Sequence, residues 1–213
     1  MGRGSSKGGG LGGGGEGLNP SDILGTKDMI SNRDSNKEAT DQVLSVARDL
    51  YDQYGQNGVL PGNFEIATLK PGARAMAYYD GSNIAINQAY FDSAKMNAAY
   101  DACVDSGFHP GRGNKSAIEA VTAHEFGHAL ADTVGQKMGG KNLHAASQAI
   151  VEEARQSLGN KKVKGFAGNI SRYATESYAE CVAEAISDVY CNGNKAKAES
   201  KAINKVVKKY LGQ

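Results

Sequence analysis

The chain has 213 residues, and its 24 Lys and Arg against 23 Asp and Glu give a formal net charge of +1. This balance argues against a dedicated nucleic-acid-binding protein, because such domains carry a clear basic excess. No stretch reaches the ~18 consecutive apolar residues of a membrane-spanning helix, and no apolar signal-peptide core is present, so we expect a cytoplasmic protein without membrane association.

The first segment of the chain is rich in glycine. Ten of the first seventeen residues are Gly, which leaves too little side-chain surface to offset the backbone entropy lost on folding. Residues 18–34 are polar with scattered apolar side chains. We therefore predict a disordered tail over residues 1–34 and one folded domain over residues 35–213.

The predicted domain opens with a helix, followed by short strands. Ser35 and Glu38 have the spacing of a capping box, and apolar residues at helical spacing follow them. Three segments with strand character come next: Phe64–Leu69, residues 75–79 and Ile84–Asn87. The last two flank a DGSN sequence, which is typical of hairpin turns. We expect a small antiparallel sheet here.

The remainder of the chain is predicted to be helical. Apolar periodicity and capping signals indicate helices over residues 91–105, 116–136, 142–158, 176–191 and 195–211. The last of these is rich in lysine opposite an apolar stripe, a pattern typical of the solvated outer face of a packed helix. The predicted fold class is α+β, with the small antiparallel sheet packed on a mainly helical body.

The motif that carries chemistry is an HExxH pattern in the second of these helices, formed by His124, Glu125 and His128. On a helix this spacing places both imidazoles on one face, where two neutral nitrogens can bind one Zn²⁺ at ~2.0–2.1 Å. Glu125 follows His124 directly in sequence, so it can hydrogen-bond the water on a bound zinc ion without taking that water's place as a ligand. Ser116 and Glu119 have capping-box spacing, so the motif lies on an apolar, capped helix, where burial without a metal would be costly.

The residues themselves leave the third ligand open. The metzincin pattern HExxHxxGxxH is excluded, because Ala131 and Val134 stand where it requires Gly and His. A downstream glutamate is the usual alternative. Glu176, Glu180 and Glu184 are spaced four apart, and therefore along one helical face. If these three carboxylates were buried together, a cation or hydrogen bonds from histidines would be needed to offset their mutual repulsion. If they lay on a solvated face of the helix, neither would be needed.

The two motifs together resemble a known family. HEFGH followed downstream by Tyr-x6-Glu-x2-Ala-Glu is similar to the zincin metallopeptidases related to the anthrax toxin lethal factor, and to metallopeptidase-like domains of tailed phages. The match covers mainly residues 116–191. Cys181 and Val182 depart from it, since relatives often carry aromatic residues there. The resemblance implies a zincin-like fold.

The resemblance also implies roles for individual residues. It implies Glu180 as the third zinc ligand, Tyr173 as the hydroxyl that stabilises the oxyanion, and Glu184 as the hydrogen-bond partner of a liganding histidine. Glu176 is the alternative ligand, because Glu176-x-x-Ala-Glu180 fits a shortened motif. The family binds extended peptides along a strand above the metal, and Ile84–Asn87 is the candidate for that strand.

The predicted function is zinc-dependent hydrolysis of peptide bonds in a peptide or protein substrate, with Glu125 as general base. The alternative is a structural or assembly protein of a phage, associated with the virion and stabilised by zinc, with little or no peptidase activity. His109 lies in the turn-rich segment GFHPGRG before the motif helix, and we expect it at the surface, with contact to the rim of the site as the alternative.

Overall fold

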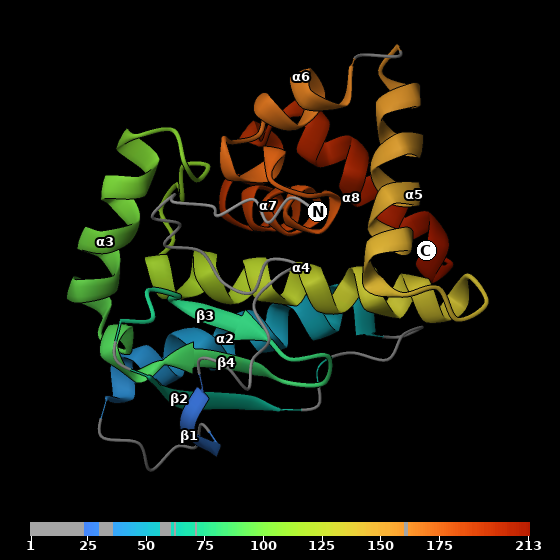
Figure 1. Cartoon of the computed structure of the whole chain (residues 1–213). Coiled ribbons are helices and arrows are strands. Elements are labelled where there is room, and N and C mark those ends of the chain that lie inside the picture. Colours follow the sequence, from blue (N-terminus) through green and yellow to red (C-terminus); the bar gives the residue numbers. More distant parts are fainter. Residues whose placement is uncertain (1–23, 30–35, 56–60, 62, 71, 160–161) are drawn as a thin grey trace, which may run out of the picture.

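The structure, a computed structural model, describes residues 24–29, 36–55, 61, 63–70, 72–159 and 162–213. Within these residues the chain has an α+β fold organised around the long helix α4 (Ala117–Lys137). A small sheet lies on one side of α4 and a group of helices from the second half of the chain lies on the other (Figure 1). The predicted fold class is confirmed at this level.

The helices predicted from residue 91 onward are all present, with small shifts at their ends. The described helices are α2 (Lys37–Tyr54), α3 (Ser93–Asp105), α4, α5 (Leu143–Ser157), α6 (Val163–Gly168), α7 (Tyr178–Asn192) and α8 (Ala198–Leu211), with 3-10 turns η2 (Gln88–Tyr90), η3 (Tyr173–Thr175) and η4 (Gly193–Lys195). Helix α6 was not predicted, since six residues are too few to show a helical period.

The start of α2 differs from the predicted capping box. Asn36 is the N-cap, and its side-chain oxygen accepts a hydrogen bond from the backbone N–H of Ala39 at 3.1 Å. Ser35 lies outside the described residues. Asn and Ser are about equally good N-caps, so the sequence alone does not distinguish two adjacent candidates.

The described sheet has four strands, β1 (Leu24–Met29), β2 (Phe64–Leu69), β3 (Ala77–Tyr79) and β4 (Ile84–Asn87), in the order β1-β2-β4-β3. Strands β3 and β4 form the expected antiparallel hairpin, but β2 and β4 are parallel. The prediction of an antiparallel sheet was therefore wrong, and the sheet is mixed. Turn chemistry specifies only the local hairpin between β3 and β4, and not the partner of β2.

Strand β1 lies within the segment 1–34 that was predicted as a tail. It pairs with β2 in antiparallel orientation, from Leu24 opposite Leu69 to Met29 opposite Glu65. Pairing with an existing strand supplies the backbone hydrogen bonds that an isolated segment lacks. Residues 1–23 and 30–35 lie outside the described part of the chain, so the tail prediction there stays a prediction.

Helix α4 forms the centre of the core. It contacts α2, β3 and β4 on one side and α5, α7 and α8 on the other, and nearly all of its residues are buried. The contact with α7 is very close at Gly127, since a Cβ placed there would lie 2.7 Å from the Cα of Ala183. The absence of a side chain at Gly127 therefore lets the backbones of α4 and α7 approach each other.

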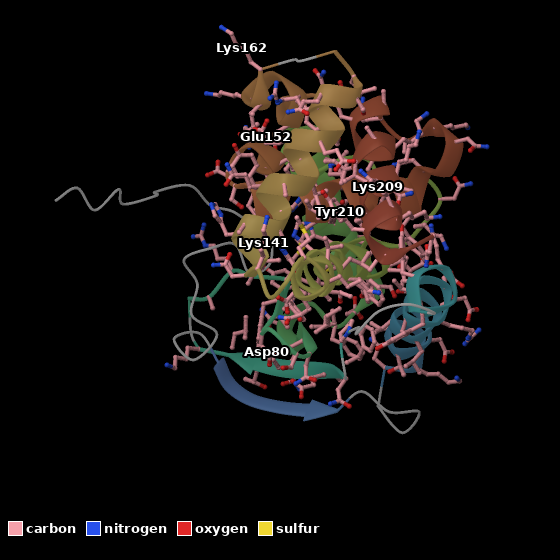
Figure 2. The ribbon with its side chains drawn as sticks, turned by 90° about the vertical axis from the view of Figure 1, so that its right-hand side faces the viewer. Asp80, Lys141, Glu152, Lys162, Lys209 and Tyr210 are labelled. Carbon is pink, nitrogen blue, oxygen red and sulfur yellow. The ribbon has the colours of Figure 1, made fainter. Side chains whose placement is uncertain are left out.

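Helix α8 closes the fold against α5. Lys209 and Tyr210 both bind Glu153 of α5, with a distance of 2.6 Å from Lys209 Nζ and 2.9 Å from the Tyr210 hydroxyl. Figure 2 shows these two side chains beside α5, with Asp80 of the β3–β4 turn lower in the same view. Among the described helices, none combines the length and the apolar character needed to span a bilayer.

Candidate metal centre

Helix α4 positions the two histidines of the HExxH motif. The predicted capping box is present at its start, where Ser116 Oγ accepts from the Glu119 N–H at 3.2 Å and Glu119 Oε2 accepts from the Ser116 N–H at 2.8 Å. One turn of helix separates His124 and His128, whose ring centroids are 5.0 Å apart. Both imidazoles are buried. The local sequence thus fixes both rings on one face, as predicted.

Helix α7 adds a carboxylate to the two imidazoles. Ser177 caps α7 by accepting from the backbone N–H of Glu180 at 3.1 Å, so Glu180 lies in the first turn. Its Oε2 is 3.1 Å from His124 Nε2 and 3.6 Å from His128 Nε2. Glu176 precedes the helix and is exposed. Of the candidate third ligands, the fold therefore brings Glu180, and not Glu176, to the histidines.

These three side chains could hold a metal ion, because their potential ligand atoms all lie within 4.8 Å of one another. The Nε2 atoms of both histidines and both oxygens of Glu180 are buried without a hydrogen-bond partner of good geometry. Such buried polar atoms are costly unless something satisfies them. A cation between them would do so, and two imidazoles with one carboxylate suit a divalent transition metal.

The electrostatics of this group also favour a cation. Burial raises the pKa of Glu180, but the two imidazoles lower it further, to about 2, so the carboxylate is ionised. Burial lowers the pKa of His124, whereas the nearby carboxylates of Glu180 and Glu184 hold it well above its ordinary value. The negative charges of Glu180 and Glu184 thus stabilise positive charge next to the two imidazoles.

Glu184 contacts Nδ1 of His124, the ring nitrogen that does not face Glu180. Its Oε1 lies 2.8 Å from His124 Nδ1 and 3.0 Å from His109 Nδ1, and its Oε2 accepts from the Ser171 hydroxyl at 2.7 Å. Charge and hydrogen bonds from the two histidines outweigh burial and lower the pKa of Glu184 to about 2. An ionised Glu184 accepts the Nδ1–H of His124, which leaves Nε2 of that ring free to bind a metal.

The expectation that His109 lies at the surface was wrong. Its side chain is buried, and its ring stacks on Tyr100 with a centroid distance of 5.0 Å and an interplanar angle of 3°. The turn-rich sequence around His109 predicts an exposed loop. That loop instead folds inward against η3, where a buried acceptor is available. The sequence offers no spacing that would have predicted this long-range contact.

Glu125 lies beside the group without belonging to it. Its side chain is 0% exposed, and neither carboxylate oxygen has a hydrogen-bond partner of good geometry. Burial raises its pKa above the ordinary value, although the charges of His124 and His128 offset part of this effect. A buried, unpartnered carboxylate with a raised pKa has the properties of a general base that can also return a proton.

Tyr173 lies in η3, before α7, and contacts the same group. Its ring stacks on His124 with a centroid distance of 5.9 Å, and on Phe108 at 4.7 Å. Burial and the carboxylates of Glu180 and Glu125 raise the pKa of its hydroxyl. The hydroxyl therefore stays protonated at neutral pH and can donate a hydrogen bond beside the candidate metal position.

The candidate substrate strand is corrected by the sheet topology. Ile84–Asn87 is β4, which is hydrogen-bonded on both sides, to β2 and to β3. Strand β3 instead forms one edge of the described sheet and contacts α4. Tyr79 of β3 donates to Asp132 Oδ2 of α4 at 3.1 Å, which ties this edge to the motif helix. The edge strand beside α4 is therefore β3, and its Ala77 and Tyr78 are buried.

Comparisons of the chain with protein-family models, curated proteins and solved structures found no match. The class of the site therefore rests on its own geometry: a buried His–His–Glu group that could hold a metal ion, next to a buried carboxylate. The resemblance to zincin metallopeptidases, which the sequence indicates, stays a prediction.

Proposed function

We propose that this chain is a zinc-dependent endopeptidase with a zincin-like domain. The observation that carries the proposal is the state of Glu125, a fully buried carboxylate that no side chain hydrogen-bonds, next to three side chains that could hold a metal. A metal site that served stability alone would gain nothing from burying a fourth, unpaired acidic group beside it. A site that activates water requires one.

The proposed ion is held by His124, His128 and Glu180. Two imidazoles and one carboxylate form a donor set typical of catalytic zinc, which keeps a further coordination position open. Zn²⁺ bound there would supply a Lewis acid that polarises the substrate carbonyl and lowers the pKa of a water molecule toward ~7. Glu184 orients His124 for this role through the 2.8 Å contact with its Nδ1.

Two side chains of this protein would handle protons and charge during hydrolysis. Glu125 takes the proton of the attacking water and delivers it to the nitrogen of the leaving amine, and its raised pKa favours that return. The protonated hydroxyl of Tyr173 donates a hydrogen bond to the oxygen of the scissile carbonyl as negative charge develops on it. The stack on Phe108 holds the Tyr173 ring in place.

The proposed substrate is an extended peptide that pairs with β3, an edge strand of the described sheet. Extended peptides commonly bind by adding a strand to an exposed sheet edge, with main-chain hydrogen bonds supplying the affinity. Strand β3 is an edge strand of the described sheet and contacts the motif helix α4. Its Ala77 and Tyr78 are buried, and Tyr79 is partly exposed, so Tyr79 is the residue of β3 that a peptide could reach. Strand β4 cannot take this role, because it is paired on both sides within the described sheet.

The experiment that tests this proposal measures zinc and peptide cleavage together. Full-length protein is analysed for bound metal and incubated with a peptide library, with products identified by mass spectrometry, including the N-terminus of the protein itself. We expect one zinc per chain and cleavage that falls by ~10²–10⁴-fold in Glu125→Gln, with zinc retained. Glu176→Gln, a matched change at an exposed glutamate, should leave both unchanged.

Two results would contradict the proposal. Full activity in Glu125→Gln would exclude this carboxylate as the base. In the second result, the wild type binds stoichiometric zinc and unfolds on chelation without cleaving any peptide. That result would support a zinc-stabilised structural or assembly protein.

A further inference from the structure

We propose that His109 is a positioning residue of the metal centre, which fixes the ring of His124 through Glu184. The inference rests on the proposed function only in taking His124 as a metal ligand. His109 lies on the segment between α3 and α4, so it belongs to neither of the helices that carry the HExxH motif and Glu180.

The hydrogen-bond arrangement around Glu184 carries this inference. One oxygen, Oε1, contacts the Nδ1 atoms of both His109 and His124, at 3.0 and 2.8 Å. The other oxygen accepts from Ser171 at 2.7 Å. A carboxylate oxygen can only accept, so each Nδ1 carries a hydrogen. For His124 this selects the tautomer whose Nε2 has a free lone pair. His109 helps to hold the carboxylate in the orientation that makes this selection.

The surroundings of His109 hold its ring in the orientation required. The ring stacks face to face on Tyr100 and packs edge-on against Phe108 and Tyr173, with centroid distances of 5.0, 4.9 and 5.4 Å. These contacts would be satisfied equally well by phenylalanine. Burying an imidazole in an aromatic cluster is costly unless its polar atoms are used. The contact with Glu184 uses Nδ1 of this imidazole, whereas Nε2 is buried without a hydrogen-bond partner of good geometry.

The same segment also holds Tyr173. The carbonyl of Gly107 accepts from the Arg172 N–H at 2.9 Å, and the carbonyl of Phe108 accepts from the Tyr173 N–H at 3.0 Å. Three consecutive residues, 107–109, therefore fix the backbone of η3 and the carboxylate behind His124. The segment links the proposed oxyanion donor to a proposed metal ligand.

The test compares two substitutions that separate hydrogen bonding from packing. His109→Phe keeps the ring stack and removes the donor, whereas His109→Asn loses the ring and places an amide N–H near the position of Nδ1. Zinc affinity is measured by competition with a chromogenic chelator. We expect His109→Phe to weaken zinc binding by ~10–100-fold and His109→Asn to restore most of it. His144→Phe, at an exposed histidine of α5, should leave the affinity unchanged.

A packing role for His109 predicts the opposite order, with His109→Phe close to the wild type and His109→Asn impaired. That result would overturn the proposal. Circular dichroism checks that each variant folds, and His109→Gln, whose longer amide misses the position of Nδ1, replaces His109→Phe if the latter does not fold.

A second measurement needs neither zinc nor activity. In ¹⁵N-labelled, metal-free protein, the hydrogen-bonded Nδ1–H of His124 should give a slowly exchanging downfield signal that exchanges faster with water in His109→Phe. An unchanged His124 signal in that variant would also overturn the proposal. If the wild type bound no zinc, the proposed function would fail, while this signal would still decide whether His109 positions His124.

Discussion

The substitution Gly127→Ala tests the contact between the two helices that carry the proposed ligands. A Cβ at this position would lie 2.7 Å from the Cα of Ala183 and 3.2 Å from the Cβ of Ile186. The nearer atom belongs to the backbone, so no side-chain rotation relieves the overlap. Helices α4 and α7 would have to move apart, and with them His124 and Glu180.

The magnitude follows from two opposing effects. Extra methyl groups in packed cores cost ~1–3 kcal/mol, and an overlap with backbone places this one near the upper end, at about 3 kcal/mol. Alanine is favoured over glycine in a helix interior by ~1 kcal/mol. The net loss of unfolding free energy is therefore about 2 kcal/mol, which for a chain of this length lowers Tm by ~4–8 °C.

Thermal and urea unfolding, followed by circular dichroism with and without zinc, measures this loss. Gly165→Ala is the matched control, because Gly165 also lies in a helix but has no atom within 4 Å of the position that an alanine methyl group would take. That variant should be as stable as the wild type or more stable by up to ~1 kcal/mol. If Gly127→Ala were as stable as Gly165→Ala, the close approach of α4 and α7 would be refuted.

Two further predictions concern the carboxylates of the site. Glu180→Gln should abolish stoichiometric zinc binding while Glu176→Gln retains it, which metal analysis of the purified variants will show; the reverse result would make Glu176 the ligand. The pKa of Glu184 is about 2 against an ordinary 4.5, so its ionised form stabilises the metal-free fold above pH 4.5, and this stability is lost as the pH falls from 4.5 toward 2. Urea unfolding at pH 7 and pH 3 should show a smaller difference in Glu184→Gln than in the wild type; equal differences would contradict a depressed pKa.

The helices and the core of the site were predictable because their signals are local. The HExxH spacing, the capping box of α4 and the four-residue spacing of Glu180 and Glu184 each depend on one helix, whose period is fixed by backbone geometry.

The features that were not predicted depend on contacts between distant parts of the chain. The parallel pairing of β2 with β4 joins two strands that are not connected by a tight turn, so no turn sequence encodes it. His109 meets Glu184 across 75 positions of sequence, in a segment without periodicity. Glu176 and Glu180 have the four-residue spacing of neighbours on one helical face. Ser177 caps α7 between them, however, so only Glu180 lies inside the helix.

The arrangement of the proposed ligands on α4 and α7 has a consequence for synthesis. His124 and Glu184 are 60 positions apart, and Glu180 lies on the same late helix as Glu184. A ribosome that has released only the HEFGH segment has made two of the three groups, so the growing polypeptide has no complete place for the ion. The proposed hydrolytic activity would therefore arise late, together with the docking of α7, and a truncated product ending before that helix would lack a complete set of proposed ligands.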